Sequence, residues 1–238
     1  MAGLEPAAVS LIPGAFILVV LWRLRSDLRE AESQQPINGA PGFASIAPGP
    51  RVTRKLLSLY RPLATGARRP APSDCRLQNV ATRRLTYCDV YLFDLLDTAG
   101  TDAAMIERQA VAVISPHLRL PTFLMFPRAE VDGPLARLGN ENLGRLTDRF
   151  GPLVEFAHPD EFTARYLVRS PDPDATRQFL DARRLRQLAR SRLLIVRAAG
   201  DAFVLSRIEL PIRSPAGETL QQRVDLAIDV YSVLRAGS

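Results

Sequence analysis

The chain has 238 residues, of which 47% are hydrophobic and 24% are charged, and its formal net charge is +6. This length accommodates one ordinary domain with an anchor and a linker, and the composition excludes an intrinsically disordered chain. Residues 1–90 contain 12 Lys and Arg against 6 Asp and Glu, whereas residues 91–238 contain 19 of each, so the basic character belongs to the first part of the chain.

The segment from Ala7 to Trp22 contains 16 residues and no charge. A membrane-spanning helix normally needs about 17 to 25 apolar residues, so this one is short, and a buried or interfacial helix is the alternative. A cleaved signal peptide would begin with a positive region, which is missing here. We predict a single-pass protein of the cell membrane, in which residues 1–35 form the transmembrane anchor with a helical extension. The rule that positive flanks stay inside places the rest of the chain in the cytoplasm, because one acidic residue precedes the segment and three arginines follow it: Glu5, Arg23, Arg25 and Arg29.

Residues 36–50 are rich in Pro and Gly and indicate a linker. Residues 51–84, the start of the predicted soluble domain 51–238, contain nine cations and one anion. A flexible basic segment beside anionic lipid gains about 1 kcal/mol per cation, so we predict contact with a membrane surface, with a solvated surface as the alternative. Nucleic acid is disfavoured, because Tyr60 is the segment's single aromatic residue. The candidate lipid or polyanion contacts are Arg51, Arg54, Lys55, Arg61, Arg68 and Arg69.

Runs of β-branched and aromatic residues begin after this basic segment. Leu85 to Leu96 and Ile106 to Ile114, separated by a polar stretch, predict a hairpin whose first strand is covered on both faces. A third strand is predicted at Thr122 to Phe126. Two further short segments, Leu153 to Phe156 and Ala164 to Arg169, are also candidates for extended structure.

The last third of the chain contains helix signals. Asp172 followed by Pro173 is typical of a helix start, and apolar residues at helical spacing continue to Ala189. A second hairpin is predicted from Leu193–Ala198 and Phe203–Ile208, and a final helix from Ser214 to Gly237. This order predicts an α+β fold, in which an N-terminal transmembrane helix precedes a mainly antiparallel sheet with two C-terminal helices packed on it.

Four short motifs suggest a family. Over about residues 75–210 the chain resembles a group of uncharacterised bacterial membrane-anchored proteins, although the hairpin loop is acidic and alanine-rich where that group has Gly, Ser and basic residues. The resemblance implies an N-terminal membrane segment and a domain of unknown activity, and it assigns no functional residue. The motifs are Phe93-Asp94, Gln109-x-Val111, Leu120-Pro121-x-Phe123 and Phe162-x-x-Arg165-Tyr166-Leu167-Val168.

Side chains that could catalyse a reaction or bind a metal are few. His117 and His158 both stand beside proline in predicted turns, without the spacing of a metal site. Cys75 and Cys88 do not form a disulfide framework, so we expect a reducing compartment and small buried thiols. Phosphate-binding glycine loops are missing from the sequence, and we predict no cofactor, no metal and no assigned catalytic residue.

Asp94 is the least ordinary carboxylate, because it ends an apolar strand, and we expect a partner for it inside the fold, with Arg108 as the candidate. Two functional hypotheses follow. The first is a non-enzymatic binding or regulatory module at the cytoplasmic face of the membrane, with a protein partner left unidentified. The second is a hydrolase-like enzyme that uses loop carboxylates such as Asp94, Glu130 and Asp160.

Overall fold

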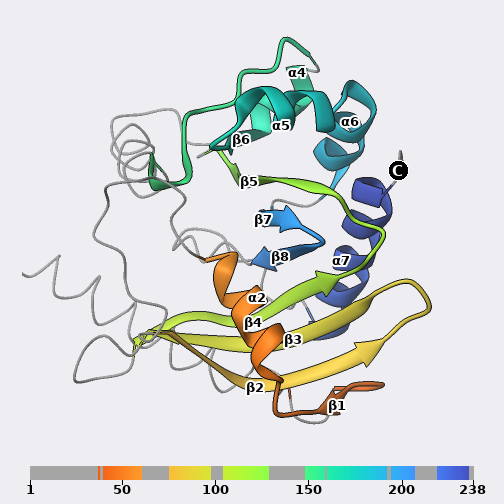
Figure 1. The fold of residues 1–238 in the computed structure, drawn as a ribbon. Helices are drawn as coiled ribbons and strands as arrows, with labels where there is room; N and C mark the ends of the chain where they lie inside the picture. Colours follow the sequence, from red (N-terminus) through yellow and green to blue (C-terminus); the bar gives the residue numbers. More distant parts are fainter. Residues whose placement is uncertain are drawn as a thin grey trace, which may run out of the picture. The chain divides into compact units, whose positions relative to one another are not determined.

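One antiparallel sheet organises the part of the chain that the computed structural model describes, which is residues 37, 40–60, 75–97, 104–128, 148–158, 160–191, 194–206 and 219–235. Its strand order is β1-β2-β3-β4-β8-β7-β5-β6 (Figure 1). The strands are β1 (Ala44–Ser45), β2 (Cys75–Arg84), β3 (Asp89–Asp97), β4 (Ala104–Ile114), β5 (Leu120–Pro127), β6 (Tyr166–Arg169), β7 (Ile195–Gly200) and β8 (Ala202–Ser206). The helices are α2 (Pro50–Ser58), η3 (Asp148–Phe150), α4 (Asp160–Arg165), α5 (Pro173–Phe179), α6 (Ala182–Arg190) and α7 (Leu220–Arg235).

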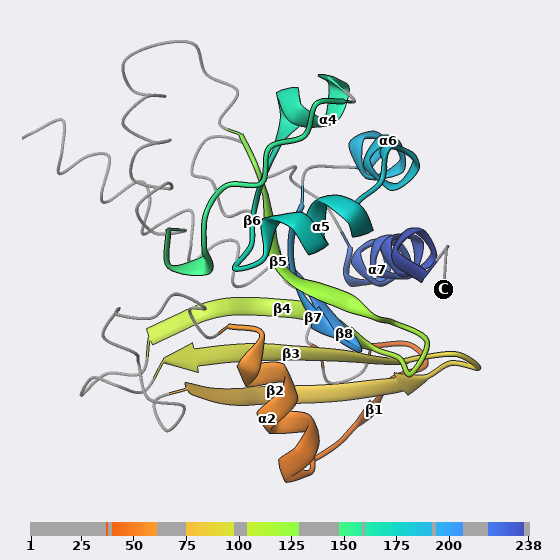
Figure 2. The ribbon, with the colours of Figure 1, turned by 45° about the horizontal axis from the view of Figure 1, so that its top comes forward.

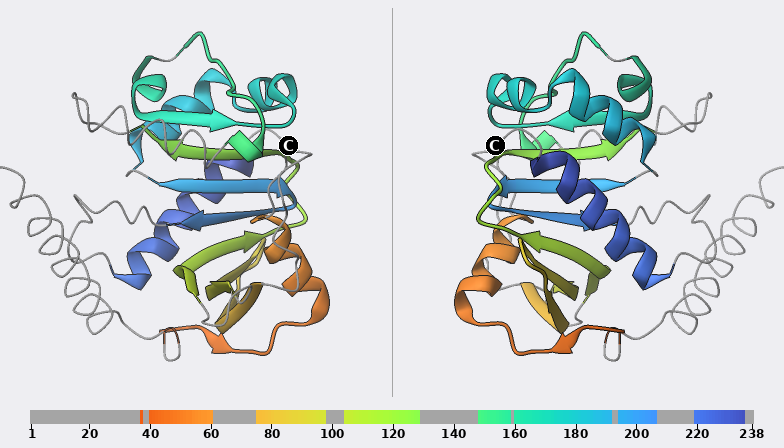
Figure 3. Two further views of the ribbon diagram at one scale, coloured as in Figure 1. Left: turned by 90° about the vertical axis from the view of Figure 1, so that its left-hand side faces the viewer. Right: turned by 90° about the vertical axis from the view of Figure 1, so that its right-hand side faces the viewer.

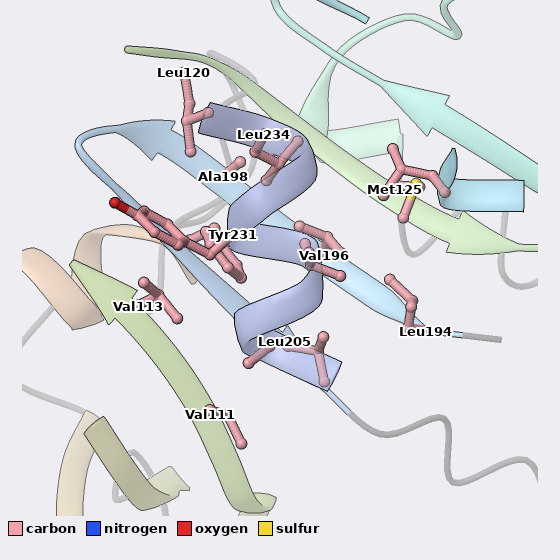
Figure 4. Packing of buried hydrophobic residues seen from close by; sticks show 14 of the residues in the cluster. Val111, Val113, Leu120, Met125, Leu194, Val196, Ala198, Leu205, Tyr231 and Leu234 are labelled. Carbon is pink, nitrogen blue, oxygen red and sulfur yellow. The ribbon is translucent and has the colours of Figure 1, made fainter. Parts of the chain in front are cut away.

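Both faces of the sheet are covered, as the alternation of apolar residues in β3 predicts. Val90 and Leu92 belong to the larger core, which α4, α5, α6 and α7 cover. Tyr91, Phe93 and Leu95 belong to a second core on the opposite face, where α2 packs. In Figure 3, α7 runs across the middle strands of the sheet, and Figure 4 shows its Tyr231 and Leu234 among side chains of β4, β5 and β7. The predicted α+β class with an antiparallel sheet is therefore confirmed.

The helix predicted from Asp172 to Ala189 is two helices, so the expected pair of C-terminal helices is wrong in number. Asp172 caps α5 by accepting a hydrogen bond from the amide of Ala175 at 3.0 Å. Leu180 then leaves the helical conformation, and Asp181 caps α6 by accepting from the amide of Arg184 at 2.8 Å. The second aspartate starts a new helix, which the apolar spacing alone does not reveal.

The start of α7 follows from a local cap. The amide of Thr219 donates to the side chain of Gln222 at 2.9 Å, and the amide of Gln222 donates back to the hydroxyl of Thr219 at 3.2 Å. This reciprocal pair is a capping box, which satisfies amides that the first turn leaves without partners. The predicted start at Ser214 lies outside the described residues.

The hairpins are confirmed, but their limits differ from the prediction. β3 pairs with β4 and β7 pairs with β8, both antiparallel. Residues 85–88 form a turn and not the start of a strand, because the amide of Leu85 donates to the carbonyl of Cys88 at 2.8 Å. The strand before that turn, β2, was not predicted. It and α2 both lie within the basic segment 51–84.

The later short segments divide differently. Predicted strand Leu153–Phe156 contributes a single bridge, between Leu153 and Arg169. Of predicted segment Ala164–Arg169, the first two residues end α4 and the rest form β6. The predicted third strand is confirmed as β5.

The region before α2 also contributes to the domain. Ile37 and Ala40 are buried in the larger core, and β1 pairs with β2 through Ala44 and Thr82. The apolar segment 7–22 and most of residues 1–39 lie outside the described residues. Among the helices that the structure does describe, none combines the length and apolar content needed to cross a bilayer.

Candidate functional site

Three chain reversals meet at one end of the sheet, which we call the turn end (Figure 2). They are the β2–β3 turn, the β4–β5 connection and the β7–β8 turn. Ile114 of β4 pairs with Asp89 on one side and with Ala202 on the other, so the three reversals are neighbours across the strands. The amide of Ser115 also donates to the carbonyl of Asp201 at 2.9 Å. Segments far apart in sequence therefore form one surface.

Tyr87 is the exposed aromatic residue of this end, with 52% of its surface accessible. The guanidinium of Arg235, at the end of α7, lies 4.7 Å from the centre of its ring, and the His117 ring meets it edge-on with centroids 6.0 Å apart. The Tyr87 carbonyl accepts hydrogen bonds from the hydroxyls of Ser115 at 2.6 Å and Tyr231 at 3.2 Å. The backbone of the turn is thus held in place while the ring faces solvent beside a cation.

Four arginines of the turn end contribute positive charge: Arg83, Arg84, Arg119 and Arg235. The Arg84 side chain is 88% exposed, and its Nε lies 3.3 Å from a carboxylate oxygen of Asp89. Arg119 is exposed and donates to the carbonyls of Pro116 and Leu118, which orients its guanidinium without neutralising it. The nearby Asp201 is paired with Lys55 of α2. The set therefore retains a positive excess.

A pocket of about 570 Å³ opens beside the β2–β3 turn, on the face of the sheet that α2 covers. Arg83 stands in its wall, with its Nε 3.6 Å from the position that a Cβ on Gly42 would occupy. No residue in the described part of the chain forms a hydrogen bond or ion pair with Arg83, which is half-buried. The pocket is lined by Gly42, Ala44, Ile46, Thr82, Arg83, Arg84, Asp89 and Tyr91.

The tyrosine of this pocket remains a hydrogen-bond donor at neutral pH. Burial raises the pKa of Tyr91, and the negative charge of Asp89 raises it further, while Thr82 and Arg84 oppose these effects. A tyrosine with a raised pKa keeps its proton. Tyr91 and the two arginines therefore make the pocket rich in donors.

The predicted lipid-contact residues divide into three groups. Arg51 and Arg54 are exposed on α2, whereas Lys55 is taken up by its ion pair with Asp201. The other three, Arg61, Arg68 and Arg69, lie outside the described residues. Sequence reasoning overlooked Arg119 and Arg235, which are single arginines with no local signal, and it placed Tyr87 on a strand.

Asp94 has a structural environment, and its expected pairing with Arg108 is wrong. One carboxylate oxygen accepts from the amide of Gln109 and the other from the side-chain amide of Asn79, both at 2.7 Å. Gln109 and Asn79 have φ angles of 49° and 51°, in the left-handed region, at irregularities of the strands on either side of Asp94. The carboxylate thus holds two bulges, and Arg223 of α7 adds a hydrogen bond to the Gln109 carbonyl at 3.2 Å.

The structure does not bring the predicted carboxylates together. Asp94 is in β3, and Asp160 is exposed at the start of α4, next to β6. Five strand spacings separate β3 from β6, which corresponds to about 24 Å. Glu130 lies outside the described residues.

The histidines and cysteines also lie apart. His158 is exposed near Asp160, with 3.7 Å between their closest charged atoms. Cys88 is buried, which raises the pKa of its thiol, and neither it nor Cys75 forms a disulfide. Among the described residues, no three His, Cys, Asp or Glu side chains are grouped as metal ligands would be.

The chain was also compared with known proteins. No protein-family model, curated protein or solved structure matches it. Its own residues are therefore the basis for a functional proposal.

Proposed function

We propose that this chain is a membrane-tethered, non-enzymatic binding module whose turn end contacts anionic lipid headgroups. The observation that supports the proposal is the gathering of Arg84, Arg119 and Arg235 around the exposed ring of Tyr87. These residues come from three separate parts of the chain, and the fold brings them to one surface.

The physical chemistry of a lipid surface suits this combination. A cation near an anionic leaflet gains about 1 kcal/mol, so three arginines supply a useful but salt-sensitive attraction. Tyrosine favours the boundary between water and lipid, since its ring is apolar and its hydroxyl is polar. Tyr87, which carries Arg235 on its ring, presents both properties at one point.

Nucleic acid fits the turn end less well. Single strands are bound through successive bases stacked on several aromatic rings along a basic groove. Tyr87 is the exposed tyrosine among the described residues at this end, and its ring is already occupied on one side by Arg235. A headgroup layer requires no such row of rings.

The tether of the proposal is the apolar segment 7–22, with the rest of the chain in the cytoplasm. Cell fractionation with protease protection tests this part. We expect the chain in the membrane fraction, with its C-terminal part digested only after the cytoplasmic side is opened. A chain that is released by high salt has no membrane-spanning tether.

The lipid contact can be measured by hydrogen–deuterium exchange on the full chain in vesicles. We expect backbone amides at 85–88 and 115–119 to exchange more slowly with phosphatidylserine present than in phosphatidylcholine alone. This protection should be strong at about 0.05 M salt and weak at about 0.5 M, because salt screens exposed charges.

A matched pair of variants makes the measurement specific. Arg84 and Arg76 are both exposed on β2, but Arg84 pairs with Asp89 at the turn end and Arg76 with Leu96 towards the other end of the strand. Arg84→Gln should weaken the protection and Arg76→Gln should not. Equal protection in both lipids rejects the lipid contact, and protection by a single-stranded oligonucleotide in neutral vesicles favours nucleic acid in its place.

A further inference from the structure

The geometry of the turn end points to a more specific ligand: we propose that the pocket between β1 and the β2–β3 turn binds a phosphorylated polyol. The inference rests on the proposed function, since it names the headgroup that the turn end recognises. The same chemistry also occurs in free sugar phosphates and inositol phosphates, and the experiment below separates the two sources.

Arg83 is the anchor for the phosphate group. Its guanidinium has five N–H donors, and none of them is used within the part of the chain that the structure describes. The side chain is half-buried against Gly42, so its donors are held at the pocket wall and not spread through solvent. A half-buried arginine without an acceptor favours an anion, because each charge-assisted hydrogen bond contributes about 1.5 to 3 kcal/mol.

Gly42 contributes to this geometry through its backbone. Its φ angle is +76°, in the left-handed region that glycine adopts without strain. The turn at residues 41–42 brings the chain into β1, so that Gly42 and Ala44 form one wall of the pocket and Thr82 and Arg83 of β2 form another. The pocket is therefore built from backbone and side chains of neighbouring strands.

The second arginine and the hydroxyl groups complete the set of donors. Arg84 is bound loosely to Asp89, at 3.3 Å between Nε and Oδ1, and can turn to a stronger anion. Tyr91 keeps its proton at neutral pH and can donate, whereas Thr82 already donates to the carbonyl of Val90 at 3.2 Å. Two cations and a neutral donor face one carboxylate, which suits a phosphate dianion.

The rest of the pocket indicates what the phosphate is attached to. A volume of about 570 Å³ is typical of small-molecule sites and far exceeds the space that one phosphate needs. Asp89 is a carboxylate that can accept hydrogen bonds from hydroxyl groups. Ala44 and Ile46 offer an apolar surface for the carbon face of a ring. Donors for the phosphate, an acceptor for hydroxyls and an apolar wall together match a phosphorylated polyol.

The test uses the full chain in neutral detergent, with myo-inositol 1-phosphate and inorganic phosphate as probes in titration calorimetry. We expect the inositol phosphate to bind at least about ten times more tightly than phosphate. Arg83→Gln should reduce its affinity about tenfold, in line with the loss of one charge-assisted hydrogen bond. Arg76→Gln, on the same strand outside the pocket, should leave the affinity unchanged.

A second variant tests the polyol part separately. Asp89→Asn removes the like charge that repels a phosphate, so the affinity for inorganic phosphate should rise. It also weakens the acceptor for hydroxyls, so the preference for the inositol phosphate should shrink. Thermal unfolding of each variant checks that the fold is retained. The proposal is overturned if the inositol phosphate does not bind, binds no more tightly than phosphate, or is unaffected by Arg83→Gln.

Vesicles of matched charge identify the source of the ligand. A preference for phosphatidylinositol 4-phosphate over phosphatidylserine that Arg83→Gln abolishes supports the lipid headgroup. Binding of free inositol phosphate without this preference supports a soluble ligand. Protection of residues 115–119 by phosphatidylserine without inositol phosphate binding overturns the pocket alone. Inositol phosphate binding without that protection overturns the lipid contact alone.

Discussion

Two polar regions of the sheet, the carboxylate of Asp94 in β3 and the arginines of the turn end, differ in how their hydrogen bonds are used. Asp94 is 8% exposed and accepts one bond on each oxygen. Arg83, also within the fold, has no acceptor among the described residues. Its neighbour Arg84 is open to solvent. The first region is complete within the protein, and the second offers donors to a partner.

This difference separates residues that stabilise the fold from residues that can bind. A buried polar group normally finds its partners inside the protein, because an unsatisfied one costs about 1 to 3 kcal/mol. Asp94 follows this rule, and its partners are the two positions of left-handed backbone on the adjacent strands. The donors of the turn end are satisfied by water or by a ligand. Changes in the two regions should therefore affect different measurements.

The largest expected effect is on Asp94. Asp94→Ala removes the acceptor of the buried Gln109 amide, so we expect the free energy of unfolding to fall by about 3 kcal/mol in urea titrations. Asp229→Ala, at an exposed position of α7, should change it by less than about 0.5 kcal/mol. Equal effects of the two substitutions would show that the bulges do not depend on Asp94. Inositol phosphate binding should be unchanged in both variants.

An intermediate effect is expected at high pH. Burial raises the pKa of Tyr166 to about 12, while the Arg165 charge and a hydrogen bond with the backbone of Leu194 oppose it. Because the folded protein disfavours the ionised form, the stability from the neutral tyrosine is complete below its ordinary pKa of about 10 and is lost as the pH rises towards 12. Tyr166→Phe should flatten this decline, measured by urea titration at several pH values. A decline of unchanged slope would contradict the prediction.

The smallest effect on stability is expected at Tyr87. Tyr87→Ser alters an exposed ring and leaves the backbone carbonyl that Ser115 and Tyr231 contact, so the unfolding free energy should stay within about 0.5 kcal/mol. The protection of residues 115–119 by phosphatidylserine vesicles should nevertheless decrease. A loss of stability without a loss of protection would place Tyr87 with Asp94, among residues that serve the fold.

Local patterns predicted many of the elements. The alternation in β3 and β4, the hairpin of β7 and β8, and the cap of α5 at Asp172 are each contained within a few residues. The unpredicted strand β2 has a mixed sequence, with arginines that obscure its alternation. The candidate site was predicted only in part: Arg84 lies within the basic segment, while Arg119 and Arg235 come from regions without net charge.

The sequence by itself determined the α+β class, the antiparallel pairing of neighbouring strands and the presence of C-terminal helices, because apolar spacing and caps act over short distances. The strand order was decided by the tertiary structure, since β8 inserts beside β4 through burial of residues about ninety positions apart. That order places the turns containing Tyr87 and Arg119 beside the end of α7. It also gives Asp94 its partners, because bulges in two neighbouring strands create the donors that its carboxylate accepts.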